Sequence, residues 1–106
     1  MISKTTRRFR AAYTRLPEHV QRRAREAYRR FKENPGHPGL RFKQIHATQP
    51  VYAARVGLGY RALAIIDGET VVRFWIGTHS EYDRLLRALR AIAPNHGMQP
   101  ADYGIG

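Results

Sequence analysis

The sequence predicts an α+β fold in which an N-terminal helical hairpin packs on a four-stranded antiparallel sheet and a C-terminal helix follows. Apolar residues recur at helical spacing up to residue 34, four apolar runs with short loops between them follow from residue 40, and helical spacing returns after residue 77. The 106 residues have the length of one domain. We place this domain at residues 1–93 and a flexible tail at residues 94–106.

Two N-terminal helices are predicted by capping residues and by apolar stripes. Thr5 or Thr6 can cap the first helix, and Pro17 lies where the second helix can begin. The second helix is expected to end at the Asn34-Pro35-Gly36 turn. The N-terminal tetrapeptide MISK is too short and polar to predict a strand before the helices. We therefore expect a helical hairpin and a sheet that is antiparallel throughout.

Positive charge is the strongest signal in the composition. Nineteen lysines and arginines against eight acidic residues give a formal net charge of +11, and residues 1–34 carry eleven basic and three acidic side chains. All but three of the basic residues are arginines, whose planar guanidinium suits phosphates and stacked bases. Such a field attracts nucleic acid or an acidic protein partner. A solvated helical surface with neither role is the alternative interpretation.

The composition also excludes several classes of site. There is no cysteine, which excludes disulfides and thiolate chemistry. No apolar segment approaches the roughly 20 residues that span a bilayer, and no apolar signal region follows the basic N-terminus. The histidines show no metal-ligand spacing. We expect a cytoplasmic protein that uses no membrane, metal or cofactor.

Four strands are predicted by apolar runs with short loops between them. The runs are LRFKQIH, VYAARV, YRALAII and TVVRFWI, which begin at residues 40, 51, 60 and 70. A three-residue Gly57-Leu58-Gly59 loop would place Arg55 directly opposite Arg61. Like charges in such a pair destabilise a sheet, so we expect an anion to lie across them.

The loop at residues 67–69 decides which side chains share a face of the sheet. A three-residue loop gives a core face for the helices to cover, formed by Ala62, Ala64, Ile66, Val72, Phe74 and Ile76. The other face is semi-polar and can be left uncovered, and it carries Arg61, Leu63, Ile65, Val71, Arg73 and Trp75. A register error of one residue would exchange the two faces.

The stretch FWIGTHSEY, residues 74–82, contains a candidate site at the end of the last strand. His79 and Tyr82 lie one helical turn apart and can point toward the same end of the sheet. A histidine can act as general acid or base near neutral pH, Arg61 and Arg73 can hold a phosphate, and Tyr82 can stack on a base or orient a ribose hydroxyl. The alternative is structural, with His79 in the first turn of a helix and with Tyr82 and Trp75 in packing.

Three motifs in a fixed order resemble the RelE/ParE superfamily of type II toxin–antitoxin toxins. They are FKENPGHPGLRFKQI, RVGLGYRAL and IGTHSEYDRLL, and the resemblance covers residues 5–91. It implies a helical hairpin on a twisted antiparallel sheet and an antitoxin, here expected to be acidic, that holds the protein inactive. Some members cut mRNA in the ribosomal A site, and others poison DNA gyrase.

The resemblance also implies roles for individual residues. Arg61 matches the arginine of the family's tyrosine–arginine pair, and His79 and Tyr82 match the residues after the glycine. The implied catalytic set is Arg61, Arg73, His79 and Tyr82, and the implied RNA contacts are Arg22, Arg29, Lys43, Arg55 and Trp75.

Three hypotheses follow from the resemblance. The first is a ribosome-dependent mRNA endoribonuclease in which the ribose 2′-OH attacks and no metal is needed. The second is a toxin that inhibits DNA gyrase without being an enzyme, and the third is a decayed toxin that only binds its antitoxin. Tyr52, Ala53 and Ala54 occupy the strand where cleaving members often carry lysines.

Overall fold

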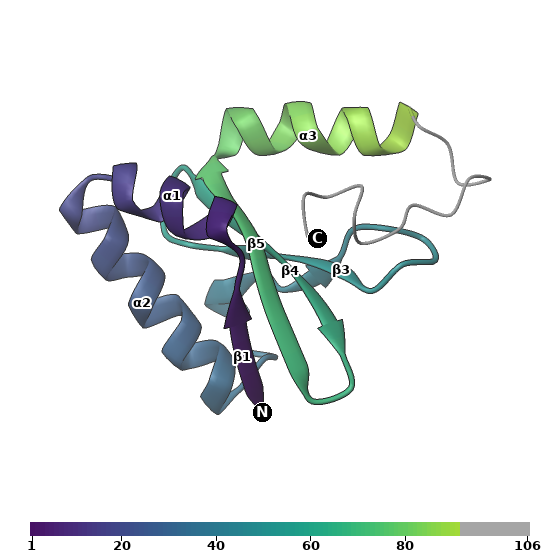
Figure 1. The fold of residues 1–106 in the computed structure, drawn as a ribbon, viewed down its shortest axis with the longest axis horizontal. Coiled ribbons are helices and arrows are strands. Elements are labelled where there is room, and N and C mark those ends of the chain that lie inside the picture. The colour runs from purple at the N-terminus through teal and green to yellow at the C-terminus, as the bar shows by residue number, and fades with distance from the viewer. Residues whose placement is uncertain (92–106) are drawn as a thin grey trace.

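The computed structural model describes residues 1–91, in which a five-stranded mixed sheet has helices on both faces (Figure 1). The strand order is β1-β5-β4-β3-β2. The predicted α+β class is confirmed, and the predicted tail at residues 94–106 lies outside the described residues. The elements are β1 (Ile2–Thr5), α1 (Arg7–Arg15), α2 (Glu18–Glu33), the 3₁₀ helix η1 (Pro38–Leu40), β2 (Lys43–Gln44), β3 (Val51–Arg55), β4 (Tyr60–Asp67), β5 (Thr70–Thr78) and α3 (His79–Ala91).

The helical hairpin forms as predicted and covers one face of the sheet (Figure 1). Thr6 caps α1, because its hydroxyl oxygen accepts a hydrogen bond from the backbone N–H of Phe9 at 3.1 Å. Pro17 begins α2 and Asn34 ends it. The apolar stripes of α1 and α2 pack against the sheet around the buried residues Phe9, Ala24, Phe31, Leu40, Val56, Val71 and Ile76.

A first strand is present, so the prediction that the sheet has four strands and is antiparallel throughout is wrong. β1 pairs parallel with β5, from Ile2 opposite Thr70 to Thr5 opposite Arg73. Most of its residues are exposed, so backbone pairing at the sheet edge holds it rather than apolar burial. Backbone pairing does not require apolar side chains. The tetrapeptide MISK therefore forms a strand without the apolar pattern from which a strand is predicted.

The predicted register between β4 and β5 is also wrong. Asp67 pairs with Thr70, so the loop contains two residues rather than three, and the register then shifts by one residue between Leu63 and Ala64. At this β-bulge, Trp75 pairs with Leu63 and Arg73 pairs with Ala64, so Phe74 is the extra residue between two successive pairs. Three β5 residues therefore point to the face opposite the predicted one. Val71 and Arg73 lie on the face covered by α1 and α2, and Phe74 lies on the face covered by α3.

Helix α3 covers part of the face that was predicted to be open (Figure 1). Its residues Tyr82, Leu85 and Leu86 pack on a cluster of buried strand residues formed by Val51, Ala53, Leu63, Ile65 and Phe74. Both faces of the sheet thus carry an apolar core. The predicted first strand, residues 40–46, is reduced to Lys43–Gln44 because η1 ends at Leu40 and Arg41 adopts a left-handed conformation. No helix within residues 1–91 is long and apolar enough to cross a membrane.

Candidate functional site

The candidate site lies where β4 begins and β5 ends. Tyr60 pairs with Thr78, and Arg61 pairs with Gly77. Two glycines with positive φ, Gly57 and Gly59 at 86° and 82°, form the preceding turn. The backbone N–H of His79 donates to the carbonyl oxygen of Gly59 at 2.7 Å. This pairing fixes Arg61 and His79 at the same corner of the sheet.

Arg55 and Arg61 are direct partners across β3 and β4, as predicted. Residues that pair directly in an antiparallel sheet point to the same face, here the face of α3. Burial and the positive charge of Arg55 lower the pKa of Arg61, whereas the nearby Tyr82 raises it. The Arg61 guanidinium donates a hydrogen bond from Nη1 to the carbonyl oxygen of Tyr60 at 2.8 Å. Arg41 adds further repulsion, so this corner favours a bound anion.

His79 is exposed and is held by a carboxylate. Its Nε2 lies 3.2 Å from Oδ2 of Asp83, one turn further along α3, and the two side chains are 49% and 48% exposed. A carboxylate at this distance orients the imidazole. The ring therefore has both the exposure and the orientation that a general acid or base needs.

The first turn of α3 is fixed by a capping box. The Thr78 hydroxyl accepts from the backbone N–H of Glu81 at 3.1 Å, and the Glu81 carboxylate accepts from the backbone N–H of Thr78 at 2.9 Å. The backbone and hydroxyl hydrogen bonds from Thr78 lower the pKa of Glu81. This cap holds the start of the helix, and with it His79, against the end of β5.

Tyr82 and Trp75 both pack against the apolar core beneath α3. Tyr82 is only 5% exposed and belongs to the core beneath α3, and its ring centroid lies 6.1 Å from that of His79. Trp75 is half-buried against the same core. A Cβ on Gly77 would come within 2.7 Å of the Trp75 indole. Gly77 therefore leaves room for the Trp75 ring because it has no side chain.

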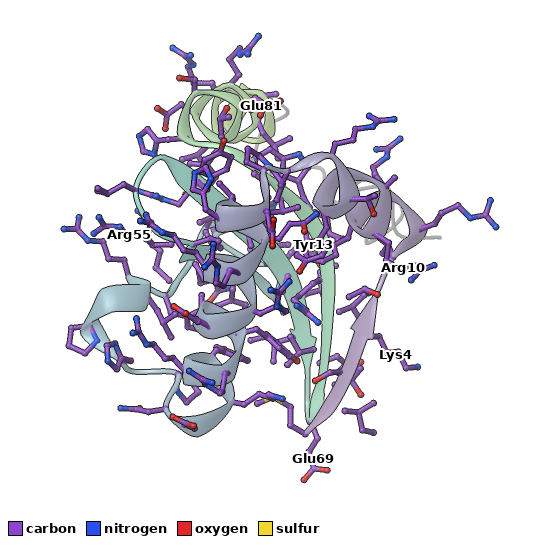
Figure 2. All side chains as sticks on the ribbon, turned by 90° about the vertical axis from the view of Figure 1, so that its left-hand side faces the viewer. Lys4, Arg10, Tyr13, Arg55, Glu69 and Glu81 are labelled. Atoms are coloured by element: carbon purple, nitrogen blue, oxygen red, sulfur yellow. The ribbon has the colours of Figure 1, made fainter. Side chains whose placement is uncertain are left out.

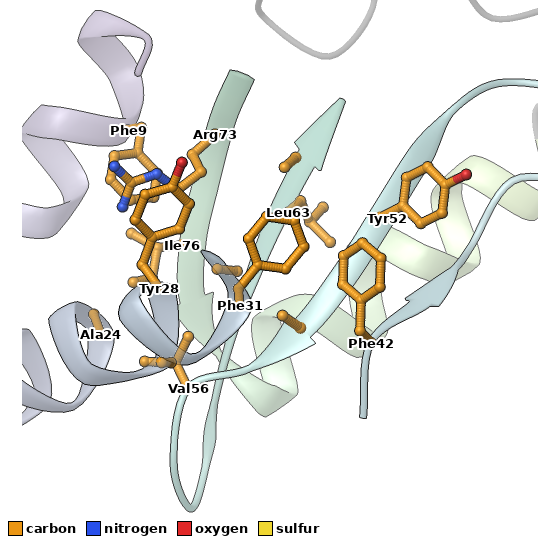
Figure 3. A pocket seen from close by; sticks show the side chains of 14 residues that line it. Phe9, Ala24, Tyr28, Phe31, Phe42, Tyr52, Val56, Leu63, Arg73 and Ile76 are labelled. Carbon is orange, nitrogen blue, oxygen red and sulfur yellow. The ribbon is translucent and has the colours of Figure 1, made fainter. Parts of the chain in front are cut away.

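Arg73 does not join this site. Its guanidinium carbon lies 3.7 Å from the ring centroid of Tyr28 and 5.2 Å from that of Phe9, on the face covered by α1 and α2 (Figure 3). Arg61 points to the opposite face. The prediction that both arginines share one open face is wrong, because the shorter loop moved Arg73 to the other side of the sheet.

The predicted RNA contacts lie on several surfaces. Lys43 is exposed opposite Ala53, on the same face as Arg61. Arg22 and Arg29 are exposed on α2, which covers the other face. Arg55 borders a hollow of about 330 Å³ that α2 also lines, through Arg23 and Arg30 (Figure 2 labels Arg55).

Comparison with known proteins gives the family. Residues 18–84 match the family described as the ParE-like toxin domain. The chain belongs to this toxin family. The resemblance to RelE/ParE toxins is thereby confirmed, and no curated protein matches the chain.

Several solved toxin structures share the fold of this chain. It is similar to the RelE–RelB complex of Pyrococcus horikoshii, at 18% identity and a TM-score of 0.61, covering 73% of this chain and 92% of that chain. It is also similar to the YoeB/ParE toxin of Agrobacterium tumefaciens, at 13% identity and a TM-score of 0.63, covering 74% and 99%. The RelBE toxin–antitoxin complex of E. coli is similar at 15% identity and a TM-score of 0.59, covering 73% and 94%. These likenesses show the fold alone.

Four residues near the candidate site of this toxin were not predicted from the sequence. Asp83 and Arg41 lie near Arg61, and Arg23 and Arg30 line the hollow that Arg55 borders. Asp83 had a recognisable signal, since a carboxylate four residues after a histidine faces it on a helix. Arg23, Arg30 and Arg41 had none, because α2 carries arginines around most of its surface and the left-handed turn at Arg41 is not visible in the sequence.

Proposed function

We propose that this toxin cuts mRNA on the ribosome. The observation that supports the proposal is the Arg55–Arg61 pair at the same corner as an exposed, carboxylate-oriented His79. Cleavage of RNA by its own 2′-OH needs cationic groups that stabilise the charge on phosphorus and a group that moves a proton. This corner offers both.

In the proposed reaction, Arg61 and Arg55 bind the non-bridging oxygens of the scissile phosphate. The ribose 2′-oxygen attacks phosphorus and loses its proton, and the 5′-oxygen leaves and gains one. His79 serves one of these two proton transfers, oriented by Asp83. The products are a 2′,3′-cyclic phosphate and a free 5′-hydroxyl.

The remaining residues of the corner have supporting roles in this proposal. Tyr82 is too buried to stack on a base in this conformation, so we assign it to positioning Arg61, whose charged form it favours. Trp75 and Lys43 share the face of Arg61 and border the path of the RNA. Arg73 has no part in the chemistry, because it lies on the other face.

We also propose an acidic antitoxin as the partner. The net charge of +11 favours such a partner, and two of the similar structures are complexes of RelE-type toxins with their antitoxins. Co-purification with the product of a neighbouring gene tests the proposal. Affinity that falls as salt rises is expected, and tight binding to a basic partner regardless of salt would contradict it.

DNA gyrase is the second candidate target. Tyr52 and Ala54 on β3 contribute no cation to the sheet, whereas Arg22, Arg25 and Arg29 are exposed on α2. A toxin that acts through its helices rather than through its sheet fits that distribution. The His79 corner has no function in this alternative.

One experiment separates the candidate functions. The toxin is induced in cells, and translation and plasmid supercoiling are followed in parallel. The proposal predicts that translation stops first while supercoiling is preserved. Loss of supercoiling with continued translation would establish the second candidate, and no effect on either would leave a protein that only binds its antitoxin.

A further inference from the structure

The guanidinium of Arg73 is enclosed between two aromatic rings. It lies over Tyr28 at 3.7 Å and over Phe9 at 5.2 Å, and Figure 3 shows it between them. The hydroxyl of Tyr28 is hydrogen-bonded to Ser3 of β1, which fixes one wall. Because both planar faces are occupied, Arg73 cannot stack on a base. Only the edge of the guanidinium remains for a ligand.

One donor on that edge is not satisfied within the described chain. The Nε of Arg73 is buried and has no hydrogen-bond partner among residues 1–91. A buried donor without an acceptor costs free energy that cation–π contacts offset only in part. Burial lowers the pKa of Arg73, and the nearby Tyr28 and Tyr13 raise it. The Nε–H therefore lacks an acceptor among the described residues, and an anion in the adjoining hollow would supply the missing counter-charge.

A hollow of about 420 Å³ lies beside this guanidinium, on the α1 side of the molecule (Figure 2 labels Arg10 and Tyr13). None of the described residues that line it is acidic. Arg25 is oriented there by a 2.6 Å hydrogen bond from its Nη1 to the Tyr13 hydroxyl, and Arg10 donates to the carbonyl oxygen of Thr5 at 2.7 Å. The lining residues are Thr5, Phe9, Arg10, Tyr13, Thr14, Ala24, Arg25 and Arg73.

We infer that this hollow binds a carboxylate side chain of an acidic partner polypeptide. An arginine edge and a carboxylate match in bidentate geometry, and no acidic side chain among the described residues lines the hollow beside the three arginines. Phe9 and Ala24 give the hollow an apolar part, which suits apolar neighbours of the acidic residue rather than a nucleotide. The inference rests on the acidic partner proposed above and assigns to it a place of contact, and it is separate from the proposed RNA chemistry because the hollow and His79 lie on opposite faces of the sheet.

The test measures binding of a short synthetic peptide in which glutamates alternate with leucines, and of the same peptide with glutamines. Arg73→Gln removes the proposed contact, and Arg15→Gln removes an equal charge from the exposed end of α1. The Arg73 Nε–H signal is followed in ¹H–¹⁵N spectra. We expect the glutamate peptide to shift this signal and Arg73→Gln to weaken binding about tenfold or more, since hydrogen bonds to charged groups contribute on that scale. Arg15→Gln should change affinity by less than about twofold.

Several results would overturn the inference. Equal binding of both peptides, an unmoved Nε–H signal, or equal losses in Arg73→Gln and Arg15→Gln would each do so. Displacement of the peptide by single-stranded RNA, with a shift of the same signal, would assign the hollow to nucleic acid instead. If Arg73→Gln unfolds, Arg10→Gln replaces it and should weaken the glutamate peptide more than Arg15→Gln does. None of these readouts depends on RNA cleavage, so they stand apart from the proposed function.

Discussion

Arg55 and Arg61 face each other as direct partners across two adjacent strands, on the face of the sheet that carries His79 at its end. Two positive charges in this position repel each other and weaken the strand pair. The repulsion is part of what lowers the pKa of Arg61. A bound phosphate would offset the repulsion, so we expect an anion that binds there to stabilise the strand pair.

Replacing Arg61 by alanine should not destabilise the free protein. The variant loses one hydrogen bond to the backbone and also the repulsion from Arg55 and Arg41, so the free energy of unfolding should change by no more than about 0.5 kcal/mol. Thermal unfolding with and without added phosphate checks this. Phosphate should stabilise the wild type more than Arg61→Ala, with Arg87→Ala on exposed α3 as the charge-matched control. An early-melting Arg61→Ala variant would show that the residue is structural.

Gly77→Ala should destabilise the fold through one identified collision. The new Cβ would meet the Trp75 indole at 2.7 Å, and overpacking of this kind costs about 1–3 kcal/mol. Trp75→Phe removes the ring atoms that collide. Chemical denaturation of the two single variants and the double variant should therefore show that Gly77→Ala costs less in the Trp75→Phe background. Strict additivity would contradict the packing explanation.

Glu81 should make stability depend on pH. Its pKa is held below the ordinary value of 4.5 by the hydrogen bonds from Thr78, so its contribution is fully present above that value and is lost as pH falls through the lower folded pKa. Glu81→Gln keeps the cap geometry but does not titrate. Urea unfolding at about pH 7 and about pH 3 should show a larger loss in the wild type than in Glu81→Gln. Equal losses would mean that the capping box contributes nothing.

The contact between His79 and Asp83 should matter for activity more than for stability. His79→Ala should lower RNA cleavage roughly 100-fold, the scale of a lost general acid or base. Asp83→Asn should cause a smaller loss, because it removes the orienting charge and keeps the imidazole. Both variants should melt close to the wild type, since the two side chains are about half exposed. Equal losses of activity and melting temperature would favour a structural role.

The sequence predicted what depends on local patterns. The hairpin of α1 and α2, the start of α3 at His79 and the pairing of Arg55 with Arg61 all follow from caps, periodicity and a glycine loop. The position of Arg73 did not, because a two-residue loop and a bulge opposite Leu63 changed the register in ways that side-chain alternation cannot reveal. β1 was missed because an exposed edge strand held by backbone bonds needs no apolar pattern.

The most direct test of the proposed function is the cleavage of a defined mRNA in a reconstituted translation system, mapped by primer extension. The wild type and Arg87→Ala should cut the message only when ribosomes are present. Arg61→Ala and His79→Ala should cut at least roughly 100-fold more slowly while melting normally. Cleavage that persists at the wild-type rate in both variants, or a wild type that leaves mRNA intact and instead blocks gyrase supercoiling, would contradict the account.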